Sequence, residues 1–144
     1  MKNLLFVICL FSVVGICSCT KDDNSIPLVG KWNVVSDSTY YTGIGPNGTP
    51  SFTKYVGQPG DYFNFTAQGK AYFKEGNTFS ATATYKVTGN NVNLVYSNFV
   101  VNDSTINATS GGYIIAAITP RTLVLTNQFI TPGGATFTTV KLSK

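Results

Sequence analysis

The sequence contains no histidine, and its three cysteines all fall within the first 19 residues. Histidine is the usual general base at neutral pH and the commonest metal ligand in proteins. Without it, and with no thiol after Cys19, neither a Ser–His nor a Cys–His nucleophile can be assembled. The same shortage excludes an intrachain disulfide beyond the leader. We therefore expect no catalytic residue, no metal site and no cofactor, and we expect that the protein is not an enzyme.

Charged residues and strong helix formers are also scarce. Only 11% of the residues are charged, while threonine, asparagine, serine and glycine are abundant. β-Branched and aromatic residues take the place of glutamate, glutamine and arginine, and no stretch shows the periodicity of an amphipathic helix. At 144 residues the chain is long enough for one domain. The composition therefore predicts a single all-β domain.

The charges that are present do not gather into a recognisable site. The net charge is +4, but the basic residues are scattered and form no stripe interleaved with aromatic residues. Nucleic acid is therefore not an expected partner. The acidic residues beyond the leader region stand singly in the chain: Asp37, Asp61, Glu75 and Asp103. Two of them can meet in space as a glycosidase pair, but we interpret them as solvated acids at turns and strand ends.

The N-terminal segment has the organisation of a secretory signal. Lys2 supplies the positive charge, and residues 4–16 form an apolar run. This run is shorter than the roughly 20 residues that a transmembrane helix needs, and it matches the apolar core of a signal peptide. We therefore predict a signal peptide over residues 1–18 and a polar, flexible tether over residues 19–25.

The end of this leader resembles a bacterial lipobox. In residues 16–19, ICSC, the small Ser18 precedes a cysteine, as in lipoproteins whose cysteine is acylated and becomes the mature N-terminus. The resemblance implies that Cys19 is the lipid-attachment residue and that its acyl chains hold the protein on a membrane. Asp22-Asp23 resembles the acidic export tag of surface lipoproteins of Bacteroidota. The implied location is the outer membrane, on the periplasmic side or at the cell surface. The alternative is an ordinary secretory signal, with Cys19 as an incidental thiol.

From Leu28 onward the chain alternates apolar and polar residues in short segments separated by turn residues. Residues 28–41 are typical of a first strand, with Trp32, Val34 and Ser36 on one face. The later segments follow as sequential hairpins that end at glycine, asparagine or proline. About eight such strands favour a small antiparallel up-and-down β-barrel over residues 26–144. Closure of the barrel removes the unpaired edges of an open sheet.

Several of these segments resemble the lipocalin-like domains of Bacteroidota lipoproteins. Gly30-Lys31-Trp32 is similar to the lipocalin Gly-x-Trp signature, and the pattern continues to a terminal Lys-Leu-x-Lys. The resemblance implies a monomeric barrel that binds or carries a small apolar molecule. Gly30 leaves room for another chain segment to cover the Trp32 ring. A basic residue covers this ring in lipocalins, so Arg121 is a candidate for a cation–π contact with Trp32. The alternative is that Arg121 is a solvated residue at the start of a strand.

The inward faces of the predicted strands supply the candidate ligand site. They hold aromatic residues and no charged ones, and we assign ligand binding to Phe63, Phe65, Phe73, Tyr85 and Tyr96. The alternative is a filled core with no cavity. The leading hypothesis is therefore a membrane-anchored, ligand-binding lipocalin-like lipoprotein. Its rival is a cell-surface interaction module, such as an adhesion or inhibitor protein, with a solid β core and a long Gly/Pro loop over residues 42–59.

Overall fold

The computed structural model describes residues 27–43, 48–105 and 110–144, and all regular structure in these ranges is β-strand. The strands are β1 (Gly30–Tyr41), β2 (Ser51–Val56), β3 (Tyr62–Phe65), β4 (Lys70–Glu75), β5 (Phe79–Thr88), β6 (Asn91–Val101), β7 (Ser104–Thr105), β8 (Ser110–Ile118), β9 (Thr122–Thr131) and β10 (Gly134–Ser143). Within these ranges no helix is long and apolar enough to cross a membrane. The predicted signal peptide, Cys19 and the tether lie outside the described residues.

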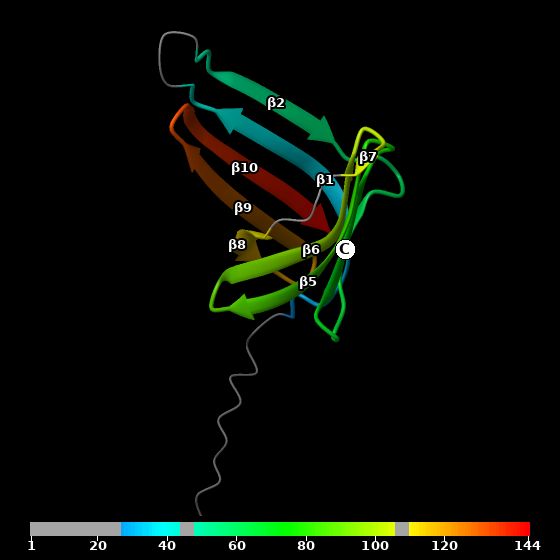
Figure 1. Cartoon of the computed structure of the whole chain (residues 1–144). Helices are drawn as coiled ribbons and strands as arrows, with labels where there is room; N and C mark the ends of the chain where they lie inside the picture. The colour runs from blue at the N-terminus through cyan, green and yellow to red at the C-terminus, as the bar shows by residue number, and fades with distance from the viewer. Residues whose placement is uncertain (1–26, 44–47, 106–109) are drawn as a thin grey trace, which may run out of the picture.

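Eight of these strands close into an antiparallel β-barrel (Figure 1). Their order around the barrel is β1-β3-β4-β5-β6-β8-β9-β10, and β10 returns to pair with β1. The strand β2 pairs with the outer part of β1, and the short β7 pairs with β6. The all-β barrel of about eight strands that the sequence predicts is therefore confirmed.

The first strand organises the barrel because it pairs with three other strands. Its start, from Gly30 to Asn33, pairs with β3, and its second half, from Ser36 to Tyr41, pairs with β2. On its other edge it pairs with β10 from Asn33 to Tyr41. The strands β2, β1, β10 and β9 therefore continue beyond the barrel as one sheet, which we call the arm and which reaches toward the upper left of Figure 1.

The ring of strand pairings is interrupted where the arm begins. The strand β9 pairs with β8 only as far as Thr126, which lies opposite Ile114. Beyond that point β9 pairs with β10 alone, and the start of β8 pairs with β6 alone. One end of the barrel, which we call the closed end, is therefore a continuous ring. At the open end the arm separates from the other strands.

The closed end is filled by the hydrophobic core. Trp32 is fully buried, and its indole N–H donates a hydrogen bond of 2.8 Å to the Leu28 carbonyl oxygen. Other large side chains are buried as completely and alternate along their strands: Phe63, Phe65, Val92, Leu94, Leu123, Leu125, Val140 and Leu142. This half of the barrel is therefore packed with side chains.

The last residue of the chain covers the buried tryptophan. Lys144 Nζ lies 4.2 Å from the centroid of the Trp32 ring, which is a cation–π geometry. Gly30 has φ of +132°, and a Cβ there would lie 3.3 Å from Lys144 Cε, so the lysine uses the room that the glycine leaves. Arg121 is exposed, and its carbonyl oxygen accepts a hydrogen bond of 3.1 Å from the Lys144 amide. The structure corrects the predicted contact between Arg121 and the Trp32 ring, because Lys144 lies over that ring instead.

A β-bulge in the first strand changes which of its residues face the interior. Val35 is an extra residue between two positions that pair with consecutive residues of β10. Asp37 lies opposite the buried Val140 and faces the interior, whereas Ser36 lies opposite the exposed Lys141 and faces outward. The prediction that Ser36 shares a face with Trp32 and Val34 is wrong, because simple alternation takes no account of a bulge. Similar register shifts occur where β6 pairs with β5 and where β8 pairs with β9.

Candidate functional site

The open end of the barrel holds a pocket of about 280 Å³, which we call the mouth pocket. Its lining comes from β1, β3, β4, β5, β6, β8 and β10. The lining residues are Asp37, Thr39, Phe63, Glu75, Phe79, Tyr96, Phe99, Tyr113 and Thr138. The interior of the barrel is therefore packed at the closed end and hollow at the open end.

Two carboxyl groups line this pocket. The bulge at Val35 turns Asp37 inward, and Glu75 continues the inward alternation of Ala71 and Phe73 to the last position of β4. Asp37 Oδ1 and Glu75 Oε1 are both buried, and neither atom has a hydrogen-bond partner among the described residues. A buried carboxylate oxygen without a donor is costly, because it has lost water and gained nothing in exchange.

The environment of these carboxyl groups opposes their ionisation. Burial raises the pKa of Glu75 to about 7, and the negative charges of Asp37 and Asp61 add to this increase. Burial also raises the pKa of Asp37. The pKa of the Tyr113 hydroxyl is raised, chiefly by burial and then by Tyr96 and the two carboxylates. The pocket therefore disfavours negative charge, and at neutral pH Glu75 is divided between its protonated and ionised forms.

Aromatic rings supply most of the remaining lining. The rings of Tyr96 and Phe99 lie 5.2 Å apart in an edge-to-face arrangement, and Phe99 packs in the same way against Phe79 at 5.5 Å. The Phe63 and Tyr113 rings lie 6.3 Å apart. The bulge on β6 lets both Tyr96 and Phe99 face the interior. These edge-to-face contacts hold the rings in place without a ligand.

Asp61, just before β3, has a different role from the two pocket acids. Its carboxylate accepts hydrogen bonds from the Tyr55 hydroxyl (2.5 Å) and from the amides of Gln58 and Gly76 (2.7 Å each). Burial alone would raise the pKa of Asp61, but these hydrogen bonds and the charge of Lys74 outweigh it, and the pKa is lowered. Asp61 therefore fastens the β2–β3 loop to the β4–β5 turn, and its interpretation as a solvated turn acid is wrong.

The five aromatic residues predicted to bind a ligand fall into two groups. Phe63 and Tyr96 line the mouth pocket. Phe65 and Phe73 are almost fully buried, and the Phe65 ring packs edge to face against those of Phe73 and Tyr85. The Tyr85 hydroxyl donates to the Thr66 carbonyl oxygen at 2.8 Å. These three residues are part of the packed core.

Sequence reasoning missed most of the pocket: Asp37, Glu75, Phe79, Phe99 and Tyr113. Glu75 was detectable, because continuing the alternation of Ala71 and Phe73 by one step turns it inward. For Asp37, the residues give no signal of the bulge that reverses its face.

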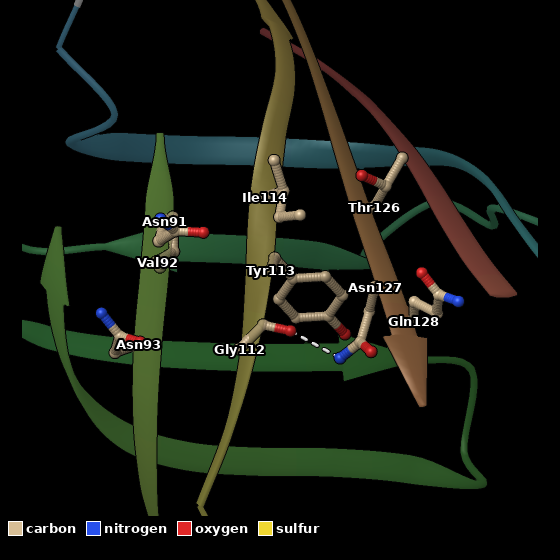
Figure 2. A pocket seen from close by; sticks show the side chains of 9 residues that line it. All are labelled: Asn91, Val92, Asn93, Gly112, Tyr113, Ile114, Thr126, Asn127 and Gln128. Carbon is tan, nitrogen blue, oxygen red and sulfur yellow. Dashed lines mark hydrogen bonds between the residues drawn. The ribbon is translucent and has the colours of Figure 1, made fainter. Parts of the chain in front are cut away.

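A second pocket of about 300 Å³ lies beside the division between β8 and β9. Figure 2 shows the Tyr113 ring between these strands, next to the amide of Asn127. Asn127 Nδ2 donates a hydrogen bond of 2.5 Å to the Gly112 carbonyl oxygen, which links the two strands where their own pairing has ended. The lining of this second pocket is mostly asparagine, glutamine and threonine and includes no charged residue. Tyr113 lines both this pocket and the mouth pocket.

The fold and the mouth pocket define a small closed β-barrel with an acidic and aromatic interior site. In the ranges that the structure describes, no group of three or more His, Cys, Asp or Glu is arranged to hold a metal ion. No protein-family model, no curated protein and no solved structure matches this chain.

Proposed function

We propose that this protein is a lipocalin-like lipoprotein, anchored to the outer membrane through Cys19, that binds a small molecule in the mouth pocket. The observation that carries the ligand-binding part is the uneven filling of the barrel. Side chains fill the closed end, whereas the open end keeps a pocket of about 280 Å³ with aromatic rings in its lining. Small-molecule sites are typically concave and largely apolar, with a few polar groups that orient the ligand. The mouth pocket combines five aromatic rings with two carboxyl and two threonine side chains.

Ligand binding is tested with apolar fluorescent probes on residues 25–144, which include the whole described barrel. We expect saturable binding at micromolar probe concentration and weaker binding after Phe99→Ala, because this change removes a ring from the lining. Phe129→Ala is the matched control, because Phe129 lies on the arm and is 65% exposed. Absence of saturable binding to any small molecule at tens of micromolar would count against the proposal.

The anchor is supported by the lipobox resemblance and the acidic pair that follows it. Mass spectrometry of the N-terminal peptide from membranes of a bacterial host is the direct test. We expect a peptide that begins at Cys19 and carries the mass of acyl chains, and we expect Cys19→Ser to abolish the modification. An unmodified peptide with a free Cys19 thiol would refute the lipoprotein part while leaving the ligand site untouched.

One observation favours the rival function, a surface interaction module. Phe52, Tyr40 and Phe137 are direct neighbours across β2, β1 and β10, and they are 64%, 45% and 39% exposed. A row of exposed apolar side chains on one sheet face is a feature of interaction surfaces. Pull-down from cell-envelope extracts tests this function: a partner that is lost with Phe52→Ser and kept with Phe129→Ser, on the opposite face of the arm, would support it.

A further inference from the structure

A purely apolar ligand would leave the two pocket carboxyl groups without hydrogen-bond partners. Asp37 Oδ1 and Glu75 Oε1 are buried without hydrogen-bond partners in the described chain. An apolar ligand would exclude the remaining water from the pocket and would increase the free-energy cost of burying both carboxyl groups. A ligand that donates hydrogen bonds and carries positive charge would instead offset that cost.

We propose that the mouth pocket binds a small organic ammonium compound, whose N–H groups donate to Asp37 Oδ1 and Glu75 Oε1 and whose apolar body lies against Tyr96 and Phe99. This inference rests on the proposed small-molecule binding and names the chemical class of the ligand. An ammonium group supplies up to three donors to two acceptors that lack any. Hydrogen bonds between ionised partners are shorter and stronger than neutral ones.

The aromatic lining supports the same choice. A cation is attracted by the negative face of an aromatic ring when it lies within about 6 Å of the ring centroid. Tyr96, Phe99 and Phe79 form a connected set of rings in the pocket that contains the two acids. Carboxylates that bind the charged head and rings that contact both head and body are therefore present in one site.

Other ligand charges fit less well. No lysine or arginine is among the described lining residues, so an anion would meet only negative or neutral groups. The third nearby acid, Asp61, already accepts hydrogen bonds from Tyr55, Gln58 and Gly76, and it is not among the lining residues. Because no group of three ligating side chains is found in the described residues, a bare metal ion is a poorer occupant.

The size of the pocket limits the ligand. Its volume of about 280 Å³ lies just below the usual range of small-molecule sites, which is roughly 300–1,000 Å³. An amine with one ring or a short alkyl chain fits this space.

Binding of an ammonium group is expected to displace a proton. Glu75 and Asp37 line the same pocket, and burial together with the charges of Asp37 and Asp61 raises the pKa of Glu75 to about 7. Tyr96 and Tyr113 also line the pocket, and burial raises the pKa of both hydroxyls, which remain neutral. A bound cation favours ionised Glu75, so the affinity should increase between pH 6 and pH 8.

The test is calorimetric titration of the full chain, purified in a nonionic detergent, with phenethylamine and with 2-phenylethanol as its neutral counterpart. We expect phenethylamine to bind at least tenfold more tightly. Glu75→Gln and Asp37→Asn should each weaken amine binding at least tenfold while leaving 2-phenylethanol within about twofold. Asp103→Asn is the matched control, because it removes the same charge from an exposed turn and should leave both affinities unchanged. Circular dichroism checks that each variant keeps its strands.

The outcomes separate the two proposals. If 2-phenylethanol or the apolar fluorescent probes bind and phenethylamine binds no better than its alcohol, the ammonium inference is refuted and small-molecule binding stands. If phenethylamine binds equally to the wild type and to Glu75→Gln, the assigned site is refuted. If none of these molecules binds, both proposals are refuted together.

Discussion

Replacing Asp61 by alanine removes the acceptor that joins two loops at the open end of the barrel. The carboxylate accepts hydrogen bonds from the Tyr55 hydroxyl at 2.5 Å and from the Gln58 and Gly76 amides at 2.7 Å. Hydrogen bonds to a charged group each contribute about 1.5–3 kcal/mol, and a buried donor left without a partner is itself costly. The three bonds share one carboxylate and are not additive. We therefore expect Asp61→Ala to lower the free energy of unfolding by about 3–5 kcal/mol.

This loss is large against the roughly 5–15 kcal/mol that stabilises a typical domain. Urea denaturation followed by Trp32 fluorescence measures it, because the sole tryptophan is fully buried in the folded barrel. Asp61→Asn keeps one acceptor oxygen and should lose about 1–3 kcal/mol, whereas Asp103→Asn at an exposed turn should lose less than about 0.5 kcal/mol. A loss below about 1 kcal/mol for Asp61→Ala would refute the role that we assign to this carboxylate.

The same prediction has a pH dependence with a definite sign. The pKa of Asp61 is lowered in the folded protein, so its contribution to stability is present above the unfolded pKa of about 3.9. That contribution is lost as the pH falls through the folded pKa. Wild-type stability should therefore fall more steeply below pH 4 than the stability of Asp61→Ala.

Three further predictions concern other parts of the barrel. Glu75→Gln should raise the free energy of unfolding at pH 8 by roughly 1–2 kcal/mol after allowance for partial exposure. The folded pKa of Glu75 is raised to about 7, so the wild type loses stability as the pH rises, and the gain from the substitution should vanish near pH 4 in urea titrations. Lys144→Ala should cost about 0.5–1 kcal/mol through the lost cation–π contact, whereas Arg121→Ala should cost less than about 0.5 kcal/mol in the same assay. Deletion of Val35 should remove the bulge but leave Asp37 opposite Val140 and facing inward, so amine binding in calorimetry and the β signal in circular dichroism should both be kept. Loss of binding with the strands intact would contradict the assignment of Val35 as the extra residue.

Much of the fold is readable from the sequence because strands with one buried face alternate strictly. Phe63 and Phe65 are two residues apart, and both are buried, as their predicted inward face requires. The glycine before Trp32 likewise predicts a covering segment, and Lys144 is that segment. Local patterns of this kind depend only on the period of the strand, so they need no knowledge of which strands become neighbours.

The mouth pocket was less accessible to the same reasoning. Asp37 faces the interior because Val35 is an extra residue relative to β10, and that mismatch exists only once the two strands are paired. The donors to Asp61 include backbone amides at Gln58 and Gly76, which any residue type supplies. Contacts that depend on register and on backbone groups leave little trace in side-chain composition.

The positions of Leu28 and Lys144 beside one tryptophan also place both ends of the described barrel at its closed end. Because the polypeptide comes into the barrel and leaves it beside Trp32, both ends emerge opposite the hollow half. An attachment made upstream of Leu28 would therefore join the barrel at the closed end and leave the mouth pocket unobstructed. A tag fused after Lys144 would likewise lie at the closed end, away from the mouth pocket.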